Sequence, residues 1–238
     1  MNNITVYIIV EGLTEQTFVR DVLAPVMKEK EIYLIPTQIG RPGHKGGNIR
    51  FSRAMPDIKM FLEQQPDVYV STMFDYFRID NQWPGIKTVK ERIDAGSTLS
   101  AVKKGNIVQD HTFEEVIKNL SNSLSESTVK RRFIPYIEMH EFEALLFSSP
   151  DILAEQTQIP ISKINSIITE HGEPEEINSE PTKAPSKQLE KLYSLKKEKY
   201  KKVGMGKSIS EAIGIGTIRK QCPHFNEWLN KLEALKTT

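Results

Sequence analysis

Acidic residues follow three separate apolar segments of the sequence, and their chemistry suggests a cation site. Glu11 follows the first segment, Asp75 follows a later one, and the last is followed by three glutamates, Glu138, Glu141 and Glu143. Mg²⁺ prefers oxygen ligands, usually one or two carboxylates together with water and substrate phosphates. Clustered carboxylates also need a counter-ion or a shared proton, because like charges repel. If folding brings these residues together, the sequence predicts a site for Mg²⁺ or Mn²⁺.

The apolar segments before these acids have the pattern of strands in a parallel sheet. Ile4–Val10 is almost continuously apolar and β-branched, as in a strand covered on both faces, and apolar residues at helical spacing follow to about Lys30. Further strands are predicted at Tyr33–Ile39, Asp67–Phe74 and Phe133–Ile137, and helices over about Ile49–Gln64, from Ile86, and over Thr112–Leu120. This alternation predicts a doubly wound, Rossmann-like α/β fold, a parallel sheet flanked by helices. Ligands of such sheets bind at the carboxyl ends of the strands, where the acids lie.

The composition changes after Pro150. Glu170–Pro185 is rich in Pro, Glu, Ser and Asn, and the rest of the chain has the pattern of charged helices without a further strand. We therefore expect an α/β domain over residues 1–150 and a helical C-terminal cap over residues 151–238. A length of 238 residues is ample to bury a sizeable core.

Composition excludes several classes of protein. The 32 Lys and Arg residues nearly balance the 31 Asp and Glu residues, so any nucleic-acid surface must be local rather than a global basic field. Cys222 is the single cysteine, which excludes an internal disulfide and a thiolate zinc site and favours a reducing cytoplasm. The sequence shows neither a signal-peptide pattern nor an apolar run of the roughly 20 residues that span a membrane. We expect a cytoplasmic protein with no membrane partner.

Each acid also has a simpler interpretation, because Asp and Glu favour helix N-termini and solvated loops. For Glu15, a capping role and a metal role are equally expected, and Glu143 lies far enough along the next helix to be exposed. His140 either binds a metal, acts as a base, or fixes the turn after the last strand. We assign three further residues to packing, namely His224, Trp83 and Trp228.

Basic residues beside the second strand are candidates for binding a nucleic-acid backbone. Arg41, Lys45 and Arg50 lie in or next to a glycine-rich loop, for which a solvated loop is an equally good description. Gly204–Ser208 (GMGKS) resembles the end of a phosphate-binding loop, but Lys201 stands where the first glycine is required, so ATP binding is not expected. This segment is predicted to begin a helix, with Lys207 either next to a phosphate or, more often in such cases, without a ligand.

The order of several short motifs resembles the DUF4276 family, a Toprim-like family related to OLD-type nucleases. The resemblance covers nearly the whole chain and rests on Glu11-Gly12, Asp75, the segment Met139–Phe147 (MHEFEALLF) and a C-terminal set that comprises Ala184–Lys187, Ile213–Ile218, Arg219–Phe225 and Trp228-Leu229. Toprim domains carry a Glu after the first strand and an Asp-x-Asp after the third. In that family the Glu assists acid/base chemistry and the aspartates hold Mg²⁺. Glu11 and Asp75 match these positions.

One position departs from the Toprim pattern, because Phe77 stands where the second aspartate is expected. By the resemblance, Asp80 would substitute for it, Glu141 would complete the site as acids do in OLD-type nucleases, and Glu138 would be a secondary ligand. Glu11, Asp75 and Glu141 would then be the catalytic residues of a Mg²⁺-dependent nuclease, a hydrolase acting on DNA or RNA in phage defence or DNA repair. The alternative is a non-catalytic or conditionally active subunit that works with a separate ATPase, since the chain has no complete phosphate-binding loop of its own.

Overall fold

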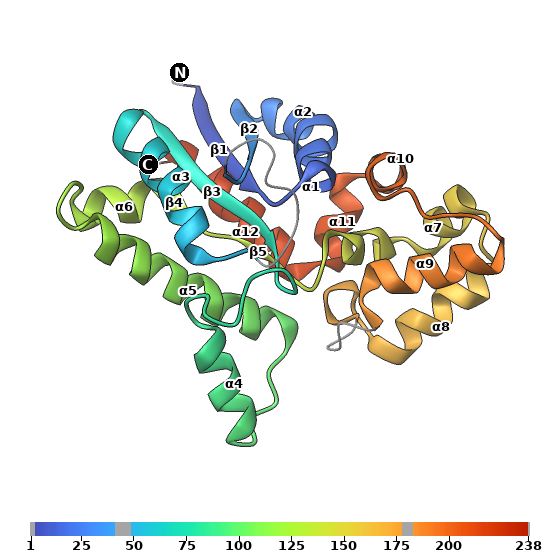
Figure 1. Ribbon diagram of the computed structural model, residues 1–238. Helices are drawn as coiled ribbons and strands as arrows, with labels where there is room; N and C mark the ends of the chain where they lie inside the picture. Colours follow the sequence, from blue (N-terminus) through green and yellow to red (C-terminus); the bar gives the residue numbers. More distant parts are fainter. Residues whose placement is uncertain (1–2, 41–48, 178–182, 238) are drawn as a thin grey trace.

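A parallel sheet forms the centre of the computed structural model, which describes residues 3–40, 49–177 and 183–237 (Figure 1). Its strands in the described part of the chain are β1 (Ile4–Val10), β2 (Ile32–Gln38), β3 (Val68–Asp75), β4 (Phe133–Ile134) and β5 (Ile137–Glu138). The strand order is β2-β1-β3-β4, β5 also pairs with β3, and every pairing is parallel. The α/β fold with a parallel sheet flanked by helices, predicted from the sequence, is therefore confirmed.

The register of the strands brings the acidic positions to one edge. Val10 pairs with Met73, so Glu11 leaves β1 close to the end of β3, and Asp75, the last residue of β3, pairs with Glu138. The predicted fourth strand is split into β4 and β5 because Pro135 has no N–H to contribute to the ladder. Tyr136 instead donates its N–H to the Thr72 hydroxyl at 2.9 Å.

Helices of the first two thirds of the chain cover both faces of the sheet. After β1 come α1 (Leu13–Phe18), the π-helical turn η1 (Val19–Leu23) and α2 (Ala24–Lys28), and after β2 comes α3 (Phe51–Gln64). The chain continues through α4 (Ile86–Asp94), α5 (Ala101–Leu120) and α6 (Glu126–Arg132). Helix α5 begins well before the predicted Thr112, because the Ser100 hydroxyl caps it by accepting the Lys103 N–H at 3.3 Å.

The last third of the chain is helical, as predicted, and begins with the 3₁₀ segment η2 (Phe142–Ser148). It continues with α7 (Pro150–Thr157), α8 (Ile161–His171), η3 (Pro174–Glu176), α9 (Pro185–Leu195), α10 (Lys202–Ile213), α11 (Ile215–Gln221), α12 (Pro223–Ala234) and η5 (Leu235–Thr237). Figure 1 shows α7, α8 and α9 grouped beside the sheet. No helix in the described ranges combines the length and the apolar composition needed to cross a bilayer.

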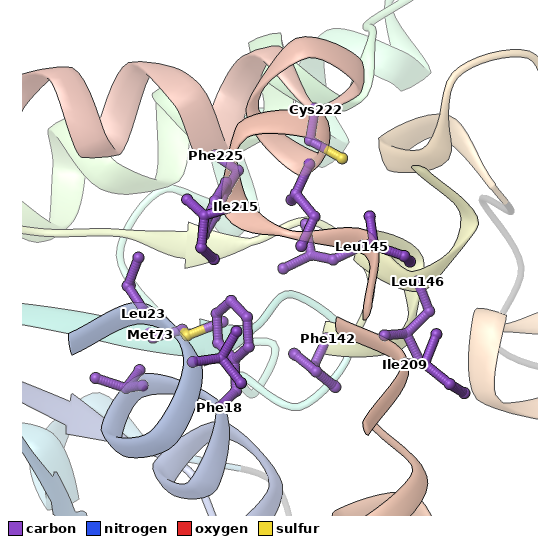
Figure 2. Close-up of a cluster of buried hydrophobic side chains, with 14 of the residues drawn as sticks. Phe18, Leu23, Met73, Phe142, Leu145, Leu146, Ile209, Ile215, Cys222 and Phe225 are labelled. Carbon is purple, nitrogen blue, oxygen red and sulfur yellow. The ribbon is translucent and has the colours of Figure 1, made fainter. Parts of the chain in front are cut away.

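Two hydrophobic cores lie on opposite faces of the sheet. Along β1, Val6 and Ile8 face the larger core, whereas Ile9 faces the smaller one, as the alternation of a strand requires. In the larger core, Phe18 of α1 contacts Phe142 of η2 and Phe225 of α12, at ring-centroid distances of 5.0 and 6.1 Å (Figure 2). Residues that are distant in sequence thus share one buried cluster beneath the acidic edge.

The C-terminal third supplies about half of the buried residues of the larger core. Trp228 of α12 stacks on Tyr136 with ring centroids 4.3 Å apart, and its Nε1–H donates to the Ser71 hydroxyl of β3 at 2.9 Å. Trp83 is also buried and donates to the Thr112 hydroxyl at 2.8 Å, and buried His224 lies 3.1 Å from the Ile137 carbonyl oxygen. The assignments of these three residues to packing are confirmed. A domain boundary near residue 150 stays a prediction, and packing is continuous across it.

Candidate functional site

Five carboxylates gather at the carboxyl edge of the sheet, around the end of β3. Asp75 is buried, and burial together with the charges of the other four raises its pKa well above the usual value of an aspartate. The five carboxylates come from the turn after β1, from α1, from β3 and from the segment after β5. They are Glu11, Glu15, Asp75, Glu141 and Glu143. The structure therefore brings together the three acids that the sequence predicted as catalytic, and it adds Glu15 and Glu143.

Glu11 has a buried carboxylate oxygen without a hydrogen-bond partner. Its Oε1 lies 3.3 Å from Arg78 Nε, whereas its buried Oε2 has no hydrogen-bond partner. Burial and the charge of Glu15 raise the pKa of Glu11 to about 7, against the opposing charges of Arg78 and Lys202. Near neutral pH, Glu11 is thus divided between its protonated and ionised forms, as suits a group that exchanges protons.

Glu15 combines the two roles that the sequence left open. Its Oε2 accepts the Gly12 N–H at 3.0 Å, which caps the start of α1. The same side chain is buried, its charge raises the pKa of both Glu11 and Asp75, and burial raises its own pKa. The capping interaction is observed directly, and it fixes a further negative group beside Asp75.

The segment after β5 holds its acids through backbone contacts. The Phe142 N–H donates to Asp75 Oδ1 at 3.1 Å, which ties η2 to the end of β3. Glu141 precedes η2 in extended backbone, and its Oε2 accepts the Ser186 N–H at the start of α9, 3.0 Å away. Glu143 is only 2 % exposed, and burial raises its pKa to about 7, so the expectation that it is exposed is wrong.

Lys202 is a site residue that sequence reasoning missed. It is the first residue of α10, and its Nζ lies 3.3 Å from Glu143 Oε1. Burial alone would lower its pKa, but the carboxylates of Glu143, Glu141 and Asp75 outweigh burial and raise it. The signal in the sequence was hidden because Lys202 ends a lysine-rich stretch that has the pattern of a solvated face.

Two predicted metal ligands, Glu138 and Asp80, have hydrogen-bond partners outside the five carboxylates. Glu138 is fully buried, its Oε2 accepts the Tyr136 hydroxyl at 2.9 Å, and burial, then the charge of Glu175, raises its pKa well above the usual value. Asp80 accepts the Gln82 N–H at 3.1 Å and lies 3.9 Å from Arg50 Nε. Glu138 pairs in register with Asp75, and the charge of Glu15 contributes to its raised pKa. A ligand role for Glu138 and Asp80 stays a prediction.

The basic residues predicted to bind nucleic acid lie in different surroundings. Arg41 and Lys45 lie outside the described residues, and Arg50 is a largely exposed residue before α3, at 77 % side-chain exposure. Lys207 forms an ion pair of 2.9 Å with Glu211 in the interior of α10. That helix begins at Lys202, two residues before Gly204, so Gly204–Ser208 lies in its first turns.

Close packing explains a glycine in this segment. A Cβ atom on Gly206 would lie 2.9 Å from Phe142 Cε1, so α10 packs tightly against η2. Gly206, one of the two glycines that resemble a phosphate-binding loop, is therefore explained by helix packing beneath the acidic cluster.

The oxygen atoms of the cluster suit Mg²⁺ chemically, but its described side chains do not converge on a single metal position. Across the described ranges, no three Asp, Glu, His or Cys side chains are arranged to hold one metal ion together. Mg²⁺ needs only one or two carboxylates, because water and substrate phosphates supply its remaining ligands. The unpartnered Glu11 Oε2 and the carboxylates around Asp75 are oxygen donors of the kind that such an ion would need. Glu11 and Asp75 are the residues that would hold the ion.

Comparison with protein-family models shows to which family the chain belongs. Residues 10–233 match the model described as "Domain of unknown function (DUF4276)". The chain belongs to the DUF4276 family. The resemblance that the motif order indicated is therefore confirmed over nearly the full length of this DUF4276 chain.

Two further comparisons accompany the family match. A search of curated proteins found no match to this DUF4276 chain. Among solved structures, the C-terminal region of the OLD protein of Xanthomonas campestris pv. campestris is similar to it, with 15% sequence identity and a TM-score of 0.38. That similarity covers 98% of this chain and 95% of the other.

Glu11 gives the fold a contribution to stability that decreases as the pH rises. Its pKa is about 7 in the folded protein and 4.5 for a free side chain, so between these values only the folded state holds the proton. The contribution is complete below about pH 4.5 and is lost as the pH rises through about 7. We expect Glu11→Gln, which cannot ionise, to gain stability relative to the wild type over this window, by on the order of 2 kcal/mol.

Urea unfolding of both proteins without divalent ions, across this pH window, measures the difference. Titrating groups outside the cluster, among them buried His140 and His224, are common to both proteins and cancel, whereas the coupled carboxylates Glu15 and Asp75 contribute to the measured difference. A difference that stays constant with pH contradicts the environment described for Glu11.

Proposed function

We propose that this DUF4276 protein is a Mg²⁺-dependent enzyme that processes nucleic-acid phosphodiester bonds, most specifically a nuclease. The observation that carries the proposal is the excess of negative charge around Asp75, where five carboxylates face two basic groups, Arg78 and Lys202. So many buried carboxylates ionise together only when a cation is bound, and without one some of them keep their protons; Mg²⁺ is the cation whose ligand preference they match. The two basic groups provide positive charge for a substrate phosphate beside them.

The residues of the cluster would have distinct tasks in this reaction. A bound Mg²⁺ would polarise the phosphate and favour ionisation of the attacking water. Asp75 would hold the ion, and Glu11 would either hold it as well or, with a pKa of about 7, accept and return a proton at its unpartnered Oε2. Lys202 approaches from α10 and balances the charge of Glu143, so the C-terminal third of the chain completes the site.

The biological setting proposed here rests on the Toprim-like family rather than on the geometry. We propose a cytoplasmic enzyme of phage defence or DNA repair that acts on DNA or RNA. One observation supports the alternative of a non-catalytic or conditionally active subunit that requires a separate ATPase. Phe77 occupies the position of the second Toprim aspartate, which removes one carboxylate from the usual set. If the chain binds Mg²⁺ but cleaves only when a genomically neighbouring ATPase is added, the alternative holds.

Metal binding tests the proposal directly. Because burial and mutual repulsion keep part of the cluster protonated near neutral pH, Mg²⁺ must displace protons to bind. We expect millimolar Mg²⁺ or Mn²⁺ to raise the melting temperature by a few degrees near pH 8, by about half as much or less near pH 6, and to release about one proton. Calorimetry in buffers of different ionisation enthalpy measures the proton release.

Three variants accompany this measurement. Glu11→Gln and Asp75→Asn should each abolish the thermal shift, whereas Asp110→Asn, an exposed acid on α5, should retain it. The absence of any shift with either ion, together with no cleavage of single- or double-stranded DNA or RNA, contradicts the proposed function.

A further inference from the structure

The residues directly after Asp75 place aromatic rings and a cation at the rim of the acidic cluster. Tyr76 donates its N–H to the Glu138 carbonyl oxygen at 2.9 Å, and Phe77 donates its N–H to the His140 carbonyl oxygen at 3.2 Å. Arg78 donates its N–H back to the Asp75 carbonyl oxygen at 2.9 Å. The turn is therefore tied by its backbone to the two strand ends, and the position of its side chains relative to Asp75 is fixed.

Phe77 is not needed by either hydrophobic core. Tyr76 packs against the smaller core, whereas in the described part of the chain Phe77 is half-buried and belongs to neither core. Its ring lies against the imidazole of His140, with centroids 4.9 Å apart and planes inclined by 39°, and 6.4 Å from the ring of Tyr76. The imidazole of His140 thus supports a partly exposed aromatic ring, and this ring belongs to a residue only two positions after Asp75.

His140 makes this support rigid and leaves a polar atom free. Its backbone has a φ of 63°, its side chain is 2 % exposed, and its Nδ1 is buried without a hydrogen-bond partner. Burial, followed by the positive charges of Lys104 and His171, lowers the pKa of His140 to about 4, so the imidazole is neutral at physiological pH. The planar imidazole, held in place by burial, supports the Phe77 ring from one side.

Two positive groups lie near Phe77 and the His140 ring that supports it. Arg78, with 45 % side-chain exposure, is next to it in sequence and contacts Glu11. Lys104 of α5 lies on the His140 side, near enough for its charge to lower the pKa of the imidazole. Within the described ranges, the Lys104 ammonium has no ion pair or side-chain hydrogen bond. An aromatic surface with two cations near it and an acidic cluster beside it matches a base with its flanking phosphates.

We propose that Phe77, supported by His140, is a stacking platform for an unpaired nucleobase, and that the substrate is therefore single-stranded or locally unpaired nucleic acid. The inference rests on the proposed function and specifies its substrate class. Stacking is tolerant of base identity because every base has a flat π-face, and within a duplex those faces are already occupied by neighbouring bases. Arg78 and Lys104 would contact the phosphates on either side of the stacked base.

Binding of labelled oligonucleotides by the full-length protein tests the platform. In fluorescence anisotropy with Ca²⁺ in place of Mg²⁺, we expect single-stranded oligonucleotides to bind about tenfold or more tightly than blunt duplexes of the same sequence. Phe77→Leu keeps an apolar side chain but removes the ring, and it should weaken single-strand binding by about five- to a hundredfold. Phe77→Trp should restore it. DNA and RNA versions of each oligonucleotide distinguish the two sources of the base.

An abasic scan separates stacking from a general loss of structure. In the wild type, an abasic residue at one position of the single strand should weaken binding as much as Phe77→Leu does, and the two changes together should cost no more than either alone. Tyr33→Ala is the matched control, because Tyr33 is a half-buried aromatic residue in neither core at the opposite end of the sheet. It should bind as the wild type does.

The outcomes distinguish this inference from the function on which it rests. If the wild type binds and cleaves nucleic acid but duplexes are preferred, or if Phe77→Leu and the abasic positions have no effect, the platform is wrong and the nuclease proposal stands. If the wild type binds no nucleic acid at all, both are wrong. Melting temperatures of the Phe77 variants and their shifts with Mg²⁺ show whether each variant is folded with its acidic cluster intact.

Discussion

Asp75→Asn is expected to lose metal-dependent phosphodiester cleavage by more than about a thousandfold, because a bound Mg²⁺ supplies several kcal/mol of stabilisation to the transition state. Asp75 is the carboxylate around which the other four gather, and asparagine removes its charge with almost no change of shape. The Phe142 N–H, 3.1 Å from Asp75 Oδ1, retains an oxygen acceptor in the variant. The effect on activity is therefore expected without a local rearrangement of η2.

The same substitution is expected to leave the metal-free fold as stable as the wild type or more stable. The charge of Asp75 is buried among like charges, which is unfavourable unless a cation or a proton compensates for it. Cleavage of a labelled oligonucleotide with Mg²⁺ gives the activity, and thermal unfolding in a chelator gives the stability. An active Asp75→Asn protein contradicts the proposed site.

Two further variants sharpen this experiment. Glu11→Gln should reduce activity by about a hundredfold or more, the contribution typical of a group that transfers protons. Asp80→Asn decides whether Asp80 replaces the missing second aspartate, as the family pattern suggested. From its contacts with Gln82 and Arg50 we expect activity within about twofold of the wild type, since surface ion pairs contribute little.

A fragment that ends at residue 150 is expected not to fold cooperatively. The predicted α/β domain would contain the whole sheet, but it would lose about half of the buried residues of the larger core, including Trp228 and Phe225. Exposing that face of the sheet to water removes the burial that offsets the loss of chain entropy on folding. Circular dichroism and urea unfolding of residues 1–150 should show no cooperative transition, and the fragment should bind hydrophobic dyes.

Addition of residues 151–238 as a separate chain provides the control. If the two pieces share one core, mixing them should restore a cooperative transition and the Mg²⁺-dependent thermal shift. A fragment of residues 1–150 that unfolds cooperatively and binds Mg²⁺ by itself would show instead that the boundary separates two independent domains.

The candidate site was predictable to the extent that it follows strand ends. Glu11 and Asp75 each come directly after or at the end of a continuous apolar run, and a parallel sheet places such ends at one edge. The site residues that were missed come from elsewhere. Lys202 reaches the cluster from the first turn of α10, more than 120 positions along the chain from Asp75, and no local pattern distinguishes it from the neighbouring lysines.

The sequence by itself determined the class of the fold and the edge of the sheet where the acids lie, because strand and helix periodicity are properties of short segments. Only the tertiary structure decided that Glu143 is buried, that Glu15 both caps α1 and joins the cluster, and that α10 and α12 pack where a separate cap was expected. These facts depend on contacts between distant segments, such as Lys202 with Glu143 and Trp228 with Tyr136. Such contacts are set by how whole surfaces fit together, and the spacing of residues along the chain does not encode them locally.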